Sequence, residues 1–532
     1  MAFSFVSVAA LRVTRESKGS RFPSGLRGGY HGTRTKAAAA MPFAAATPSG
    51  KRSNADGSMK TDESMEISVS AQNMIHSTPS TPLTPSTPLT PPTSLAPTAP
   101  QSGPSRISSL AGLYPESACA DQARRWASLR DSMGAIGAPG NTGRRGESDL
   151  RFYSAPGRTE LGGNHTDHNH GRVLAAAVDL DCIAAVRRRD DLVVRVRSEG
   201  YEAFELDLAE LEPRPDEEGS TAALVRGAAG WISDRHAAGG RRVLRGFEAN
   251  IRSSVLSGSG LSSSAAIEVL FGTILADLAG LSLSAVEIAR MGQYAENRFF
   301  GKPSGLMDQT ASAVGGITAI DFADPESPEV RRIDFDFADY GYSLVVVDSG
   351  GSHADLTSDY ASIPAEMKAA AAVFGKTHLR GLTRSDLASR ATEIRKACGD
   401  RAFLRAWHFA GENERAFRMA AALESGRLEE YFGLVRASGD SSWRFLQNLY
   451  PPHRPEEQGP GLALALAEEF LSGEGACRVH GGGFAGTVQI YVPTARLAGL
   501  RALLEPIFGA GSVIPVSIRP VGAAIIEPSA IP

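Results

Sequence analysis

The chain has few cysteines and no long hydrophobic run. Four of its 532 residues are cysteines, and none of them forms a CxxC pair. This argues against a disulfide framework or a structural zinc site, so we expect reduced thiols. No apolar segment reaches the roughly 18 residues that a membrane-spanning helix needs, so we expect no membrane partner. The cysteines are Cys119, Cys182, Cys398 and Cys477.

Acidic residues are almost missing from the start of the chain. Up to Ala55 there are nine Lys or Arg residues and a single acid, Glu16, whereas the remainder carries 46 basic and 58 acidic residues. The acidic main body argues against a nucleic-acid partner. Residues 1–45 are rich in Arg, Ser, Ala and Gly, which is typical of a transit peptide or of a basic disordered tail. The first reading places the protein in a plastid or mitochondrion, and the second places it in the cytosol.

Residues 46–105 are rich in Pro, Thr and Ser and carry little apolar bulk. Their centre, residues 76–100, is HSTPSTPLTPSTPLTPPTSLAPTAP. Proline removes backbone donors, and too few apolar side chains are present to offset the entropy of ordering, so we expect a disordered linker. Ordinary globular sequence starts near Ser105 and is long enough for two domains.

The globular part alternates between helical and strand-like segments. A helix is expected over residues 112–133, and strands are expected over 173–186, 191–198 and 342–350. Strand-like runs also occur within 478–492 and 512–523. This mixture predicts an α+β fold rather than a regular βαβ ladder.

A glycine loop followed by a helix stands at residues 255–280, VLSGSGLSSSAAIEVLFGTILADLAG. The glycines at 258 and 260 permit close backbone approach, and the serines at 262–264 can cap a helix that stops at Gly280. Such a helix start offers free N–H groups and a positive dipole end to a phosphate. Because no GK[ST] follows, the loop is not a Walker A motif, and a plain serine-capped helix stays an alternative.

Two acids follow in SAVEIARMGQYAENRFFGKPSGLMDQTASAVGG, residues 284–316. Ser284 and Glu287 are spaced as a capping box for a helix that has Glu296 near its end. Asp308 opens a short helical run beyond the GKPSG loop. Acids beside a phosphate-binding loop can bind Mg²⁺ or act as a base for a hydroxyl, although each alone also suits a cap or a solvated surface.

Two further stretches carry clustered glycines. HGGGFAGT, residues 480–487, precedes an apolar strand and allows a close backbone approach. APGRTELGGNHTDHNHG, residues 155–171, places three histidines and Asp167 within six positions, which suggests either a metal site or another polar binding site.

Together these stretches resemble the small-molecule kinase family that includes galactokinase, homoserine kinase, mevalonate kinase and phosphomevalonate kinase. Residues 155–171 are similar to the galactokinase signature, written PGRVNLIGEHTDY in typical members, and residues 257–266, SGSGLSSSAA, resemble the phosphate-binding motif. Residues 295–309 resemble the galactokinase stretch with the catalytic aspartate, and residues 479–487 resemble the last glycine motif. The likeness runs from about Leu113 to the C-terminus, with the motifs in the expected order.

The resemblance implies a two-lobed kinase that uses ATP and Mg²⁺, with lobes at 106–338 and 339–532 and the active site in the cleft between them. Arg158 would stabilise charge on the transferred phosphoryl group, and Asp308 would accept or orient the proton of the anomeric hydroxyl. Ser264 and Glu296 would hold Mg²⁺. The implied sugar-binding residues are Asn164, His165, Asp167, Gly305 and Tyr360, and the implied ATP-binding residues are Gly258, Gly260, Leu261, Ser262, Ser263, Ser264 and Ala265.

The sequence departs from the galactokinase pattern near the sugar. Asn164 stands where typical members have glutamate, and Glu160 stands where they have asparagine. An amide tolerates an anionic sugar better than a carboxylate does, and the two residues would compensate for each other if they share one pocket. The arginine pair that usually follows the position of Tyr360 is also missing.

These observations predict a monomeric, ATP-dependent sugar 1-kinase, with galactose as the first choice of substrate. A galacturonokinase, or a kinase for another sugar such as N-acetylgalactosamine, is the alternative within the same chemistry. A non-catalytic sensor of galactose and ATP is the alternative from another class, and the complete GLSSSAA motif with Arg158 and Asp308 argues against it.

Overall fold

The computed structural model describes residues 103–134, 150–236, 243–256, 260–302, 304–351, 356–484 and 486–532. The targeting segment predicted at 1–45 and the linker predicted at 46–105, apart from its last three residues, lie outside the described residues. The first strand begins at Ser105, next to the point where globular sequence was expected to start.

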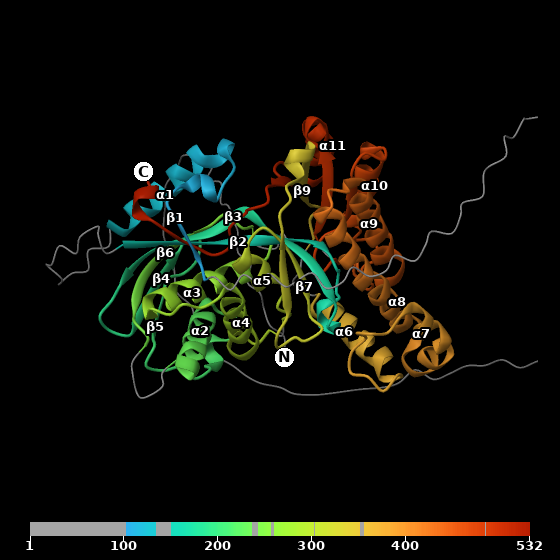
Figure 1. Ribbon diagram of the computed structural model, residues 1–532, viewed down its shortest axis with the longest axis horizontal. Coiled ribbons are helices and arrows are strands. Elements are labelled where there is room, and N and C mark those ends of the chain that lie inside the picture. The colour runs from blue at the N-terminus through green and yellow to red at the C-terminus, as the bar shows by residue number, and fades with distance from the viewer. Residues whose placement is uncertain are drawn as a thin grey trace, which may run out of the picture. The chain divides into compact units, whose positions relative to one another are not determined.

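Helices and strands occur along the whole described chain, as expected for an α+β protein (Figure 1). The helices are α1 (Glu116–Gly134), α2 (Thr221–His236), α3 (Ser263–Ala279), α4 (Ala285–Ala295), α5 (Met307–Val314), α6 (Thr357–Ala372), α7 (Arg384–Ser389), α8 (Ala391–Glu424), α9 (Leu428–Ser441), α10 (Gly459–Leu471) and α11 (Leu497–Phe508). The strands are β1 (Ser105–Ile107), β2 (Leu150–Gly162), β3 (Arg172–Arg188), β4 (Val193–Ser198), β5 (Phe204–Asp207), β6 (Phe247–Ser253), β7 (Ile317–Asp321), β8 (Glu329–Ile333), β9 (Tyr342–Asp348), β10 (Ala476–Val479), β11 (Thr487–Pro493), β12 (Val513–Val516) and β13 (Ala524–Ile526).

The strands form two sheets. Within the described residues the larger sheet has nine strands, in the order β1-β13-β2-β3-β6-β4-β5, and β7 pairs with β3 while β8 pairs with β7. The smaller sheet has the order β10-β11-β9-β12, with β9 antiparallel to both of its neighbours. The strands expected at 173–186, 191–198 and 342–350 and the helix expected at 112–133 are confirmed by β3, β4, β9 and α1.

The larger sheet is covered on both faces, which explains the nearly continuous apolar sequence of its central strands. Successive residues of β2 belong to different cores, because side chains alternate across a strand. Phe152 packs with Trp126 of α1, whereas Tyr153 belongs to the core that includes helices α2 to α5. Figure 1 shows α1 on one side of β2 and β3 and α2 to α4 on the other.

The chain returns to the larger sheet at its end. The strand β13 pairs antiparallel with β2, and β1 pairs parallel with β13. A C-terminal lobe at 339–532 is therefore not a purely sequential unit, because its last strand completes the sheet of the first lobe. The smaller sheet keeps its own core with α10 and α11, which contains Val345, Ile490 and Leu500.

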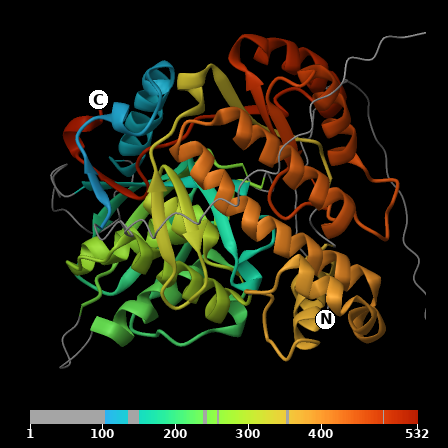
Figure 2. The ribbon, with the colours of Figure 1, turned by 45° about the vertical axis from the view of Figure 1, so that its right-hand side comes forward.

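The long helix α8, which kinks at Gly399 (φ 86°, ψ 173°), packs between the larger sheet and the helices that follow it. It contacts β3 of the larger sheet and also α6 and α9. Figure 2 shows it as a long diagonal that passes from α7 towards the centre of the structure. Because β2 ends and β3 begins close to α8, residues of the motif at 155–171 contact side chains of this helix, as Gly163 does with Glu412.

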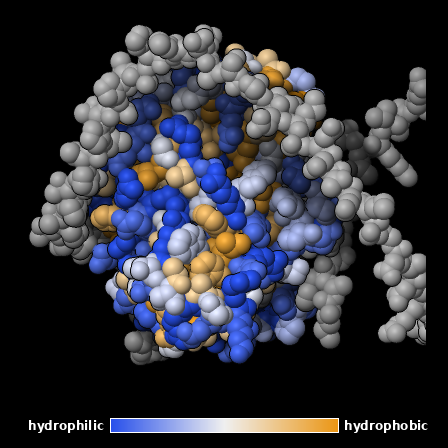
Figure 3. Space-filling view, turned by 90° about the vertical axis from the view of Figure 1, so that its right-hand side faces the viewer, coloured by the Kyte–Doolittle hydropathy of each residue, from blue (hydrophilic) through white to orange (hydrophobic). Residues whose placement is uncertain are grey.

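Hydrophilic and hydrophobic residues are mixed on the side of the structure where α7 and α8 lie (Figure 3). Among the residues that the structure describes, no helix is both long and apolar enough to cross a membrane.

Candidate functional site

An ion pair joins two of the sequence motifs. Arg158 on β2 donates from Nε and Nη2 to the two carboxylate oxygens of Asp308 on α5, at 2.8 and 2.7 Å. The side chain of Arg158 is 8% exposed and that of Asp308 is 30% exposed. Burial disfavours the charged carboxylate, but the guanidinium and its hydrogen bonds hold the pKa of Asp308 below its ordinary value. The carboxylate is therefore ionised at neutral pH.

Ser262 binds this carboxylate and does not cap the helix. Its backbone lies in the left-handed region, at φ 55° and ψ 63°, and its side chain makes no capping hydrogen bond to α3. The hydroxyl donates instead to Asp308 Oδ2 at 2.5 Å. The expectation of a serine cap is thus wrong at this position, because the left-handed turn directs the hydroxyl to the acid. The expected helix stop is confirmed, since Gly280 ends α3 in the left-handed conformation.

The start of α3 has the features of a phosphate site. The first helical hydrogen bond of α3 ends at the carbonyl of Ser262. The N–H groups of residues 263–265 therefore have no partner inside the helix, and the positive end of the helix dipole lies there. Leu261 is fully buried and anchors the loop, while Gly258 lies outside the described residues.

The last glycine motif packs against this loop. A Cβ atom on Gly260 would lie 2.7 Å from Thr487 Oγ1 and 2.9 Å from His480 Nδ1. Gly260 also has a positive φ of 71°, so glycine is required here for both space and backbone conformation. His480 is buried, with Nε2 3.0 Å from Thr159 Oγ1. Motifs far apart in the sequence thus meet around the loop.

The predicted sugar-binding residues Asp167 and Gly305 lie in contact. A Cβ atom on Gly305 would overlap with Asp167 Oδ2. His165 Nε2 lies 2.9 Å from the carbonyl of Gly482. Burial and the neighbouring His168 lower the pKa of His165 to about 3, so the ring is neutral at physiological pH. With Nε2–H donating to the carbonyl, Nδ1 of His165 becomes the acceptor.

The other histidines of this motif have different neighbours. The rings of His170 and His378 are stacked with centroids 3.7 Å apart. His168 Nε2 lies 3.5 Å from Asp167 Oδ1. Within the described ranges, no three His, Cys, Asp or Glu side chains form a group that could hold a metal ion.

Tyr360 lies against the same glycine turn as His165. Its hydroxyl donates to the carbonyl of Gly483 at 2.7 Å, and its ring meets Phe484 edge-on with centroids 5.3 Å apart. Burial raises the pKa of Tyr360, so the hydroxyl stays protonated. The turn at 481–483 is thereby held by His165 and Tyr360, which lie in distant parts of the sequence.

Asn164 binds this turn as well, through the carbonyl of Gly481 at 2.5 Å. Its side chain is fully buried, and protein groups hydrogen-bond both ends of its amide. Asn164 was also predicted to bind the sugar, but the structure places its amide behind the turn that His165 and Tyr360 contact.

The geometry agrees with the comparisons to known proteins. Residues 143–188 match the galactokinase galactose-binding signature, and residues 223–316 match the GHMP kinases N-terminal domain. Galactokinase of Streptomyces coelicolor is 34% identical over 363 residues, which cover 68% of this chain and 89% of that protein. Galactokinase of Actinobacillus pleuropneumoniae serotype 3 is 32% identical over 360 residues, with the same shares. The chain belongs to the galactokinase family.

A solved member of this family shares the fold. The galactokinase of Lactococcus lactis, crystallised with galactose, matches with a TM-score of 0.61 and 24% identity over 76% of this chain and 98% of that one. The two-lobed kinase fold expected from the motifs is thus confirmed.

The sequence resemblance implies Mg²⁺ held by Ser264 and Glu296, and both side chains carry oxygen atoms of the kind that this ion binds. Glu296 is buried, and its Oε1 accepts from Lys302 Nζ at 2.9 Å, so this oxygen already faces a cation. Gln309 Nε2 donates to Glu296 Oε2 at 3.0 Å and to Glu268 Oε2 at 2.9 Å. Ser264 stands in the first turn of α3. One carboxylate and one hydroxyl suit Mg²⁺, which keeps several water ligands.

Several residues around the site were not found from the sequence. Burial and the charge of Glu296 raise the pKa of Glu268 well above its ordinary value. Arg478 and Glu412 are fully buried beneath the motif at 155–171, and Asn448 Nδ2 donates to the carbonyl of Gly482 at 3.1 Å. The charge within the apolar strand β10 was an available sign for Arg478. Glu412 and Asn448 lie in segments without a motif, so no sequence pattern marked them.

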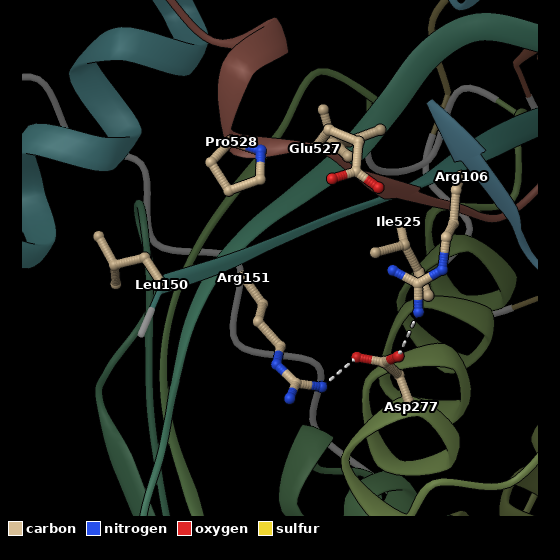
Figure 4. Close-up of a pocket in the computed structure, with 8 residues that line it drawn as sticks. Arg106, Leu150, Arg151, Asp277, Ile525, Glu527 and Pro528 are labelled. Carbon is tan, nitrogen blue, oxygen red and sulfur yellow. Dashed lines mark hydrogen bonds and ion pairs between the residues drawn. The ribbon is translucent and has the colours of Figure 1, made fainter. Parts of the chain in front are cut away.

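A cavity of about 270 Å³ lies elsewhere and is lined by residues of β1, β2, β13 and α3 (Figure 4). Asp277 of α3 accepts there from Arg106 at 3.3 Å and from Arg151 at 2.6 Å. Glu527 and Pro528 also line it, but no predicted site residue does.

Proposed function

We propose that the protein is a galactokinase, which transfers the γ-phosphoryl group of ATP to the anomeric hydroxyl of galactose. The products are galactose 1-phosphate and ADP. The observation that carries the proposal is the pair of Arg158 and Asp308 at the N-terminal end of α3. Gly305, three residues before that aspartate, contacts Asp167, which supports a sugar site next to the pair.

The ionised carboxylate of Asp308 would accept a hydrogen bond from the anomeric hydroxyl and aim its oxygen at the γ-phosphorus. As the new O–P bond forms and the bond to ADP breaks, the hydroxyl proton passes to the carboxylate or to a phosphoryl oxygen. The lowered pKa of Asp308 favours orientation over strong basicity. Arg158, already held in place, would stabilise the charge that develops on the transferred group.

The start of α3 would bind the phosphates of ATP through its free N–H groups. Mg²⁺ held by Ser264 and Glu296 would supply positive charge to the same phosphates. Lys302, which donates to Glu296 Oε1, would give up this oxygen to the ion and could then donate to the phosphates.

Neutral and charged groups would recognise the sugar hydroxyls through hydrogen bonds. Nδ1 of His165 would accept a hydrogen bond, and the carboxylate of Asp167 would accept others. The hydroxyl of Tyr360 and the backbone of Gly305 would line the rest of the sugar-binding site. A site that hydrogen-bonds each hydroxyl discriminates strongly between sugars.

The test is ADP release by the full chain with ATP, Mg²⁺ and single sugars, namely galactose, galacturonate, N-acetylgalactosamine, glucose and arabinose. Turnover on galactose that is lost in Asp308→Asn supports the proposal. Turnover on galacturonate alone would show that Asn164 and Glu160 have changed the substrate. Binding of ATP and galactose without turnover on any sugar would instead indicate a sensor.

We also propose that the enzyme is monomeric and acts in the cytosol, or in a plastid or mitochondrion if residues 1–45 are a transit peptide. Light scattering of the purified chain tests the first point. A fluorescent fusion of residues 1–45 tests the second, since diffuse cytosolic signal would rule out import.

A further inference from the structure

The exchanged residues Glu160 and Asn164 form one structural unit. The family motif has asparagine at the first of these positions and glutamate at the second, and this chain has the reverse. Asn164 Nδ2 donates to Glu160 Oε1 at 3.0 Å. The exposed fractions are 3% for Glu160 and 0% for Asn164. One carboxylate and one amide are thus kept in contact, with their places along the chain reversed.

The amide of Asn164 has no remaining hydrogen-bonding capacity for a sugar. Besides Glu160, its Nδ2 donates to the carbonyl of Gly481 at 2.5 Å. Its Oδ1 accepts from Asn448 Nδ2 at 3.0 Å and from Ser442 Oγ at 3.4 Å. A side-chain amide has two donor hydrogens and two acceptor lone pairs, so these four partners use them all. Asn164 therefore acts on the glycine turn and not directly on a ligand.

The carboxylate of Glu160 is held by a buried charge. Arg478 donates from Nη2 to Glu160 Oε1 and from Nη1 to Ser438 Oγ, the latter at 2.8 Å. Its Nη1 also lies 3.8 Å from Glu412 Oε1. That glutamate oxygen accepts the backbone N–H of Gly163 at 3.1 Å. Because an unpaired buried charge is costly, each group of this network needs its partner.

The pair is connected to the predicted sugar-binding residues by the backbone. His165 directly follows Asn164, lies in the left-handed conformation at φ 56° and bonds the carbonyl of Gly482. That carbonyl is next in sequence to the one that Asn164 binds. A shift of either residue of the pair would therefore move both His165 and the glycine turn.

We propose that Glu160 and Asn164 are a positioning pair for His165 and the turn at 481–483. The pair requires one carboxylate and one amide, and the reversal seen in this chain keeps that composition. The kinetic part of the inference rests on the proposed sugar kinase activity, whereas its thermodynamic part does not.

The experiment is a double-mutant cycle in the full chain with E160N, N164E and E160N/N164E. N164E sets a second buried carboxylate against Glu160, while E160N removes the carboxylate nearest to Arg478 and leaves the more distant one of Glu412. Each single variant is expected to raise the KM for galactose by about tenfold or more and to lower Tm. The KM for ATP should stay within about twofold, and the double variant should return to within about threefold of the parent on the galactose KM.

Glu217→Gln is the matched control, because it breaks another ion pair to a buried arginine, Glu217 Oε1 to Arg226 Nη2 at 2.6 Å. It should lower Tm without changing the KM for galactose. Additive losses in the double variant, or single variants with the parental galactose KM, would overturn the proposal. If the single variants do not fold, a folded and active double variant supports the pair and an unfolded one overturns it. If the parent turns over no sugar, the proposed function fails, but the changes in Tm still test the pair. Non-additive changes in Tm across the cycle support the pair, and additive changes overturn it.

Discussion

Replacing Asp308 by asparagine tests the central feature of the site. The substitution keeps the size of the side chain but removes the negative charge that two nitrogens of Arg158 and the hydroxyl of Ser262 bind. An amide can still accept from one partner, but its NH₂ group faces another donor. The variant should therefore lose both the orientation of the sugar hydroxyl and the fixed position of Arg158.

The size of both losses follows from the geometry. Groups that position or transfer a proton contribute about 10²–10⁴-fold to rate, so kcat should fall by that factor. Breaking a fully buried ion pair costs about 3–5 kcal/mol. Because the side chain of Asp308 is 30% exposed, water screens part of this cost, and we expect a loss of about 1–3 kcal/mol in the free energy of unfolding.

Asp277→Asn is the matched control, because Asp277 also binds two arginines but stands near the other end of α3. Fourteen residues of helix place it about 20 Å from the phosphate-binding end. Initial rates of ADP release and denaturant unfolding should be measured for both variants. An Asp308→Asn enzyme with kcat within about threefold of the parent, or an equal loss of kcat in the control, would refute the reasoning.

Three further predictions concern the sugar side, the metal site and pH. Gly305→Ala should raise the KM for galactose and leave the KM for ATP unchanged, because the new methyl group would displace the Asp167 carboxylate; equal changes in both values would contradict this. Lys302→Gln should tighten Mn²⁺ binding to the nucleotide-free protein, as followed by electron paramagnetic resonance, because it frees an oxygen of Glu296; unchanged binding would show that the lysine does not compete. Burial lowers the pKa of His408 to about 4, so the unfolded chain binds this proton first as pH falls below about 6.5, and stability present above that pH is lost towards pH 4. By pH 5 the loss from this group is about 2 kcal/mol, and His408→Asn should reduce the difference between unfolding free energies at pH 7 and pH 5 by that amount.

Local features of the site could be predicted because they depend on neighbouring residues. The helix that ends at Gly280 and the capping box of Ser284 and Glu287 both appear where the sequence places them. The expectation that Arg158 and Asp308 serve one reaction followed from matching two motifs to one family, whereas their ion pair is seen only in the structure. The role of Ser262 could not be predicted in this way, because a serine before a helix ordinarily caps it. Here its hydroxyl donates to Asp308 on α5 instead.

By itself, the sequence determined that helical and strand-like segments alternate in the globular part, the family and the residues expected to carry the reaction. These depend on periodicity and on short motifs, which are complete within a few tens of residues. The tertiary structure alone decided which distant groups share a buried space. It brought Glu160 to Arg478 and Asn164 to Gly481, across more than three hundred positions. Buried charges and amides must find partners wherever the fold supplies them, so their roles are set by packing in space and leave no mark in local sequence.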